Sequence, residues 1–177
     1  MASDAHDALN LDRLLIVPAF ANPLKGTGGA GASPVQRLEM ARLAFGDDVR
    51  LEVSSMEIDR AGLSFTVDTL EALAADHPQA ELILLLGMDS LRSIDKWRRP
   101  DRIRELARLA VLTRQADGRA GGGLDADVEI VTTRRVDVSS SEIRARLAAG
   151  KSVKGFVSES VERYIAAAKL YAPRSAD

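Results

Sequence analysis

Apolar runs alternate with helical patterns along the chain, and this alternation limits the folds that are open to it. Two of the runs, "RLLIVPA" (residues 13–19) and "ELILLLG" (residues 81–87), are nearly unbroken. Continuous runs of this length are typical of strands buried on both faces, as in a parallel sheet. The shorter candidate strands are residues 49–53, 109–113 and 128–132. The candidate helices are residues 34–45, 66–77, 99–108, 140–149 and 158–171.

Strands that alternate with helices of this length predict βαβ units with right-handed crossovers. Two of the helical patterns are followed by Gly46 and Gly150, which we expect at the C′ position. The opening stretch "SDAHDALNL" (residues 3–11) has the pattern of a helix end, whereas a doubly wound fold begins with a strand. We therefore expect one α/β domain over residues 1–177, built on a parallel sheet whose first strand is absent.

The composition excludes several classes of protein. A net charge of −2 gives no overall basic field to attract nucleic acid or anionic lipid. The chain has no cysteine, which excludes thiolate metal sites and fits a reducing cytoplasm, and its two histidines, His6 and His77, suggest neither a zinc site nor a triad. No secretory signal or membrane-spanning run is recognisable. We expect a cytoplasmic protein without nucleic-acid or membrane partners, and the sequence leaves a homo-oligomer open.

Three serines stand where a strand-like stretch passes into a helical pattern, in "VSSSEIRARL" (residues 138–147). One interpretation is a capping box, with Ser139 as the N-cap and Glu142 three residues further on. The other interpretation is a phosphate site, because serine hydroxyls, free N–H groups at a helix start and Arg144 together suit an anion. The two interpretations are compatible, since the cap can also be the site.

A second candidate site follows the most apolar run. Gly87 and Asp89 come at its carboxyl end, where ligands bind in open α/β sheets. Asp89 can accept a hydrogen bond from a ribose hydroxyl, or it can cap the next helix. Trp97, the only tryptophan, follows within ten residues and is either a partly buried core residue or a stacking platform for a ring.

Two further segments have features of anion sites. In "EIDRAGLSFTVDTL" (residues 57–70) a turn at Gly62 leads to a helix start at Ser64–Thr66. The N–H groups of that start suit a carboxylate, although an ordinary helix entry has the same pattern. The stretch "VPAFANPLKG" (residues 17–26) brings Lys25 in front of a glycine-rich loop. It is either a loop with a solvated lysine or a lid that brings a cation to a phosphate, and it is not a Walker A loop.

Taken together, six segments resemble the nicotinate mononucleotide adenylyltransferases, in the order in which that family carries them. "VPAFANPLK" resembles the family's Pro-x-x-x-x-Pro-His-Lys loop, with Leu24 in place of histidine. "EIDRAGLSFTVDTL" resembles its Glu-x-x-Arg-x-Gly-x-Ser-Tyr-Thr-x-Asp-Thr-Leu segment, with Phe65 in place of tyrosine. The other matching segments are "RLEMARLA", "LGMDSL" with Trp97 downstream, "VSSSEIR" and "FVSESVERYIAAAKLY". The resemblance implies a Rossmann-like nucleotidyltransferase fold with a doubly wound parallel sheet in three layers.

The resemblance also implies an activity and a role for each motif. The activity is adenylyl transfer from ATP to nicotinate mononucleotide, which gives deamido-NAD and pyrophosphate, with Mg²⁺ on the leaving phosphates. The residues implied for ATP are Gly87, Asp89, Ser139, Ser140, Ser141 and Arg144. The residues implied for nicotinate mononucleotide are Lys25, Ser64, Phe65, Thr66, Asp89 and Trp97. In these roles Lys25 and Arg144 act on phosphate charge as catalytic residues, Trp97 stacks on the pyridine ring, and the Ser64–Thr66 turn holds the nicotinate carboxylate.

One departure from the family pattern bears on the activity. Family members begin with a strand and a Gly-x-Phe-x-Pro-x-His-x-Gly-His motif whose histidines bind the ATP phosphates, and these 177 residues contain no His-x-Gly-His. We expect that the chain starts inside the helix that follows this motif. Two alternative functions stay open: an adenylyltransferase for phosphopantetheine or flavin mononucleotide, and a non-catalytic nucleotide-binding protein of the same fold.

Overall fold

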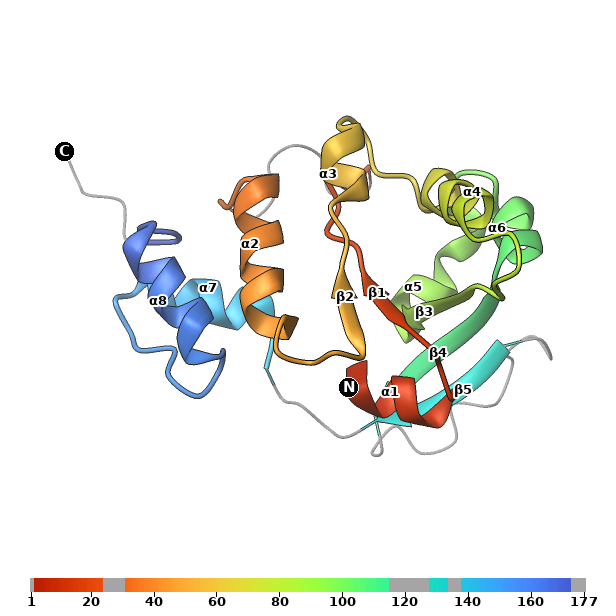
Figure 1. Cartoon of the computed structure of the whole chain (residues 1–177). Coiled ribbons are helices and arrows are strands. Elements are labelled where there is room, and N and C mark those ends of the chain that lie inside the picture. The colour runs from red at the N-terminus through yellow and green to blue at the C-terminus, as the bar shows by residue number, and fades with distance from the viewer. Residues whose placement is uncertain (1, 24–30, 115–127, 134–137, 173–177) are drawn as a thin grey trace. The chain divides into compact units, whose positions relative to one another are not determined.

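A computed structural model describes residues 2–23, 31–114, 128–133 and 138–172 (Figure 1). The contacts within the chain group its residues into two units. The first unit comprises Met1–Asp12 and Ser64–Val136, and the second comprises Arg13–Leu63 and Asp137–Asp177. Each unit contains parallel strands joined through helices, so both have α/β architecture.

The first unit is built on a three-stranded parallel sheet of order β3-β4-β5. Its strands are β3 (Ile83–Gly87), β4 (Arg108–Arg114) and β5 (Val128–Thr133), with Ile83 opposite Arg108 and Leu109 opposite Val128. Its helices are α1 (Ala2–Ala8), α4 (Thr66–Asp76), α5 (Met88–Arg92), the 3₁₀ helix η1 (Ile94–Lys96) and α6 (Pro100–Leu106). Helices α5 and α6 contact the central strand β4, α1 contacts β5, and α4 packs on α6 (Figure 1).

An apolar core joins the helices of the first unit to its sheet. Its buried members are Val67, Leu70, Leu86, Ile94, Ile103, Ala107 and Leu109. Ile103 of α6 and Val67 of α4 are both fully buried, at 0% exposure. The same core supports the two partly buried rings of this unit that the sequence singled out, Phe65 and Trp97.

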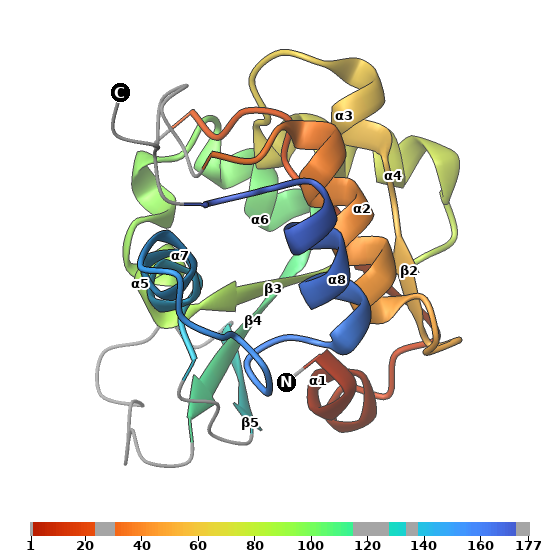
Figure 2. The same cartoon turned by 90° about the vertical axis from the view of Figure 1, so that its left-hand side faces the viewer.

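The second unit contains a two-stranded parallel sheet of β1 (Leu14–Ile16) and β2 (Leu51–Val53), with Leu14 opposite Leu51. Its helices are α2 (Pro34–Phe45), α3 (Met56–Arg60), α7 (Ser140–Ala148) and α8 (Glu159–Ala167). Helix α2 packs against both β2 and α8 (Figure 2). The Ser160 hydroxyl of α8 donates to the Leu43 carbonyl oxygen at 3.0 Å. Leu147 of α7 packs against the same apolar cluster as α8, so α7 is anchored in this unit.

The fold class predicted from the sequence is confirmed: the chain is α/β with parallel strand pairing throughout the described residues. Each of the five candidate strands overlaps an observed strand, and each candidate helix contains an observed helix. Among the described strands, β1 pairs only with β2, and β3 only with β4, so the strands form two sheets. The single domain over residues 1–177 stays a prediction.

The two glycines expected to end helices behave differently. Gly150 has a φ of +66° and follows α7 as predicted, because only a residue without a Cβ adopts this conformation freely. The prediction for Gly46 is wrong: its φ is −65° and its N–H donates to the Arg42 carbonyl oxygen at 2.8 Å, so helical geometry continues through it. A Cβ at Gly46 would lie 2.6 Å from that oxygen, so crowding, not a positive φ, favours glycine there.

None of the helices in the described ranges has the length and apolar character that crossing a membrane requires.

Candidate functional site

The start of α4 is a partly exposed helix N-terminus. Ala61 and Gly62 both have positive φ values, of 58° and 78°, and this tight turn brings the chain from α3 into the start of α4. Phe65 is the N-cap residue, and its own side chain makes no capping hydrogen bond. Ser64, Phe65 and Thr66 are all partly exposed. The segment predicted to hold a carboxylate is therefore an accessible helix start in the structure.

The turn after β3 is open to solvent. Gly87 is the N-cap residue of α5, and a Cβ built on it would meet no atom of the described residues within 4 Å. Asp89 lies in the first turn of α5, and its side chain is fully exposed, with the Arg92 guanidinium 3.9 Å away. The alternative interpretation of Asp89 as a helix cap is therefore wrong. The carboxylate remains available to a ligand at the carboxyl end of β3.

Trp97 has features of both interpretations left open by the sequence. The side chain is half-buried and packs against the core of the first unit. Its Nε1 atom is buried and has no hydrogen-bond partner among the described residues. An unpaired buried donor costs about 1–3 kcal/mol, so the ring is not held in place by its polar end. The stacking role stays a prediction.

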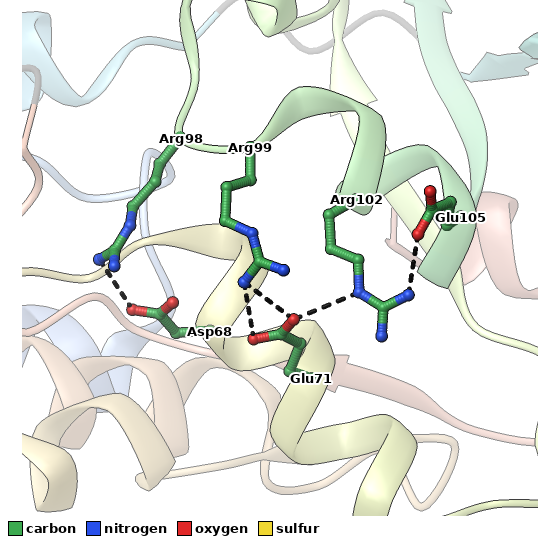
Figure 3. A network of polar contacts seen from close by, with 6 residues as sticks. All are labelled: Asp68, Glu71, Arg98, Arg99, Arg102 and Glu105. Carbon is green, nitrogen blue, oxygen red and sulfur yellow. Dashed lines mark hydrogen bonds and ion pairs between the residues drawn. The ribbon is translucent and has the colours of Figure 1, made fainter.

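A network of ion pairs joins the chain after Trp97 to α4 (Figure 3). The Arg98 guanidinium lies 4.7 Å from the centre of the Phe65 ring and 3.5 Å from an Asp68 carboxylate oxygen. Glu71, one turn further along α4, accepts from Arg99 at 3.3 Å and from Arg102 at 3.2 Å. These contacts bring the Trp97 segment and the Ser64–Thr66 turn together, as the two parts of one pyridine site would require.

The sequence analysis did not assign a role to this network. The sequence does contain the charged residues of the network. Asp68 and Glu71 are three residues apart on one face of α4, and Arg98, Arg99 and Arg102 follow Trp97. The pairing itself joins residues about 30 positions apart, and local periodicity carries no information about such contacts.

In the second unit, Ser139 is the N-cap of α7 as predicted. Its hydroxyl oxygen accepts from the Glu142 N–H at 3.1 Å, and its backbone is extended. The complete capping box, with both reciprocal hydrogen bonds, is instead seen at α2, between Ser33 and Gln36. No residue of α7 is fully buried.

The helix start of α7 also carries the predicted phosphate donors. Ser140 and Ser141 are exposed, and the Arg144 guanidinium donates to the Ser141 hydroxyl oxygen at 3.1 Å. Burial raises the pKa of the Tyr171 phenol, and the positive charges of Arg144 and Arg37 act in the opposite direction. The guanidinium groups of Arg144 and Arg37 are therefore both close enough to the Tyr171 phenol to influence its pKa.

Arg37 of α2 fixes the beginning of the loop that follows β1. Its guanidinium donates to the carbonyl oxygens of Ala19 and Phe20, at 2.6 and 2.8 Å. These residues open the segment that leads to Lys25, which lies outside the described residues together with most of the glycine-rich loop. The lid interpretation of that segment stays a prediction.

The described residues contain no group of three or more histidine, cysteine, aspartate or glutamate side chains placed to hold a metal ion. The described part of the chain therefore offers no protein cage for Mg²⁺, an ion that in nucleotide enzymes is bound through one or two carboxylates and the substrate phosphates.

Comparison with known proteins decides the family. Residues 1–146 match the family described as cytidylyltransferase-like. A protein of Gemmatimonas aurantiaca named "Probable nicotinate-nucleotide adenylyltransferase" is 44% identical over 178 residues, which covers 97% of this chain and 83% of the relative. The chain belongs to the nicotinate-nucleotide adenylyltransferase family. A second member, from Roseiflexus sp. and of the same name, is 39% identical and covers 97% of this chain and 88% of the relative.

Solved structures of nicotinate-nucleotide adenylyltransferases have the same fold as this chain. The Plasmodium falciparum nicotinic acid mononucleotide adenylyltransferase complexed with NaAD superposes with a TM-score of 0.73 at 16% identity, over 95% of this chain and 87% of that one. The structure entitled "The Crystal Structure of a Putative Nicotinate-nucleotide Adenylyltransferase from Vibrio parahaemolyticus" gives a TM-score of 0.65 at 17% identity, over 96% of this chain and 85% of that one. At these identities the likeness concerns the fold.

The cap at α7 gives a stability prediction for this family member. Ser139→Ala removes the acceptor of the Glu142 N–H and is expected to lower the free energy of unfolding by about 1 kcal/mol. Chemical denaturation monitored by circular dichroism measures the change. Ser140→Ala is the matched control, because Ser140 is exposed and lies one residue inside the helix, and it is expected to stay within about 0.5 kcal/mol of the wild type. Equal losses in both variants would contradict the cap assignment.

Proposed function

We propose that this chain transfers the adenylyl group of ATP to nicotinate mononucleotide and thereby makes deamido-NAD and pyrophosphate in NAD biosynthesis. The observation that carries the proposal is the 44% identity to a nicotinate-nucleotide adenylyltransferase over 97% of the chain. The accessible sites at the starts of α4 and α7 and at the end of β3 support it. The cytoplasmic location predicted from the sequence is part of the same proposal.

The residues of the proposed site suit a reaction without a protein nucleophile. A phosphate oxygen of the mononucleotide attacks the α-phosphorus of ATP, the new P–O bond forms, and the bond to the β-phosphate breaks to release pyrophosphate. The protein contributes positioning and charge. In the proposal, Ser139, Ser140, Ser141 and Arg144 bind the ATP phosphates, while Gly87 and Asp89 lie along the nucleotide. Mg²⁺ would enter with ATP and supply positive charge to the leaving phosphates.

The proposed nicotinate site is made of elements of the first unit. Trp97 stacks on the pyridine ring, and the start of α4 at Ser64–Thr66 receives the carboxylate. A helix N-terminus suits this group because its free N–H groups and the helix dipole both favour a negative charge. Lys25 is proposed to approach a phosphate, on the sequence pattern alone.

A non-catalytic nucleotide-binding protein is the second candidate. This candidate shares the ATP site and lacks the chemical step.

Pyrophosphate release separates the candidates. With ATP and nicotinate mononucleotide the enzyme is expected to release pyrophosphate, and with phosphopantetheine or flavin mononucleotide as acceptor it is expected to release none. ATP binding by calorimetry without pyrophosphate release from any acceptor would favour the binding protein. Release with another acceptor and none with nicotinate mononucleotide would refute the proposed substrate.

Arg144→Ala tests the proposed phosphate site. Loss of a charge-assisted hydrogen bond is expected to raise the Kd for ATP roughly tenfold, about 1.5 kcal/mol. The melting temperature should hardly change, because the one described hydrogen bond of Arg144 is to Ser141 in its own helix. Arg163→Ala, which removes an exposed arginine from α8, is the control and should leave ATP affinity unchanged. Unfolding of the Arg144 variant without loss of ATP affinity would refute the phosphate role.

A further inference from the structure

Arg98 is placed to control the charge at the start of α4. Its guanidinium lies over the ring of Phe65, the N-cap residue of that helix, at 4.7 Å from the ring centre. It also pairs with Asp68, at 3.5 Å between nitrogen and oxygen (Figure 3). Asp68 belongs to the first turn of α4. One arginine thus contacts both the cap residue and the acidic residue of the helix start.

Asp68 poses an electrostatic problem for an anionic ligand at this helix start. A carboxylate in the first turn stabilises the helix through the dipole, but it repels a second negative charge that approaches the same turn. The Asp68 side chain is only 33% exposed, so water does not fully screen its charge. The positive charge of Arg98 opposes this repulsion at close range.

We propose that Arg98 is a specificity-determining residue that acts through Asp68: by compensating this carboxylate, it lets the start of α4 bind the anionic nicotinate ring in preference to the neutral nicotinamide ring. The inference rests on the function proposed above. Arg98 need not touch the substrate for this effect, because a charge on Asp68 that is not compensated discriminates against the anionic ligand only.

The same network supplies a matched control. Arg99 makes the same kind of ion pair to the same helix, at 3.1 Å from Glu71, but one turn further from the helix start. Glu71 also accepts from Arg102, so its charge stays partly compensated when Arg99 is removed. A variant at Arg99 therefore disturbs the junction of α4 with the Trp97 segment without leaving an uncompensated carboxylate at the proposed ligand position.

Calorimetric titration with nicotinate mononucleotide and with nicotinamide mononucleotide tests the inference. Arg98→Gln is expected to raise the Kd for nicotinate mononucleotide roughly fivefold, which corresponds to the upper end of the energies measured for exposed ion pairs. The Kd for nicotinamide mononucleotide is expected to rise less than about twofold. Arg98→Lys, which keeps the charge, and Arg99→Gln should both keep the wild-type ratio of the two Kd values. Asp68→Asn combined with Arg98→Gln should restore the ratio, and added salt should reduce the effect of Arg98→Gln.

The outcomes distinguish the inference from the function on which it rests. A wild-type protein that binds neither mononucleotide refutes the proposed function, and the inference falls with it. Equal weakening of both ligands by Arg98→Gln, or a lost preference that Asp68→Asn does not restore, overturns the inference alone, since a merely structural role of Arg98 gives this result. Melting temperatures measured on the same samples identify any variant that has lost its fold.

Discussion

Ile103→Ala is expected to lower the free energy of unfolding by about 2–5 kcal/mol, the usual cost of removing most of a buried aliphatic side chain. Ile103 lies in α6 with none of its surface exposed and belongs to the core that joins α4, α5 and α6 to β3 and β4. The cavity left by alanine has walls from several elements, so a small local movement cannot close it. Chemical denaturation with a two-state fit gives the change.

The chain offers a control with the same chemical change. Ile130 of β5 is 45% exposed, so Ile130→Ala removes the same atoms from a position that water already reaches. Its loss is expected to be well under half of that for Ile103→Ala, because less apolar surface returns to water and no closed cavity forms. Comparable losses in the two variants would show that the core of the first unit does not depend on Ile103 in the way the structure indicates.

The sequence predicted the longer elements well because their patterns are long enough to be read. The runs at residues 13–19 and 81–87 are continuous, and β1 and β3 lie inside them. The helices α3, α5 and η1 were missed, since elements of five, five and three residues do not complete the periods on which the prediction depends. Ser139 was predicted correctly as a cap because a cap depends on neighbours within three residues.

The candidate site likewise has parts that the sequence predicts and parts that it does not. The serines of α7 and the turn after β3 could be named from the sequence, because each is a local motif at the end of one element. The contacts of Arg98 with Phe65 and Asp68 could not be predicted from the sequence. They depend on how α4 packs against α6 and against the segment that leads into α6. The burial of the Trp97 Nε1 atom, without a partner among the described residues, likewise depends on tertiary packing, which no local pattern encodes.

Trp97→Ala is expected to raise the Kd for nicotinate mononucleotide about 5- to 150-fold, from a stacking contact of about 1–3 kcal/mol. The Kd for ATP should change less than about twofold, because the pyridine ring and not the adenine is proposed to stack here. Calorimetry measures both constants. In the wild type, Trp97 is the only tryptophan of the chain, so binding of nicotinate mononucleotide should also change the intrinsic fluorescence.

A second substitution separates stacking from support of the core. Trp97 packs against the same core as Phe65, so its removal also exposes apolar surface, and a lower melting temperature of Trp97→Ala alone decides nothing. Trp97→Phe keeps an aromatic face and removes the N–H that has no described partner, so it should retain most of the nicotinate affinity and most of the stability. If Trp97→Ala weakens ATP and nicotinate mononucleotide equally and melts at a lower temperature, Trp97 is a core residue and the proposed ring site must lie elsewhere.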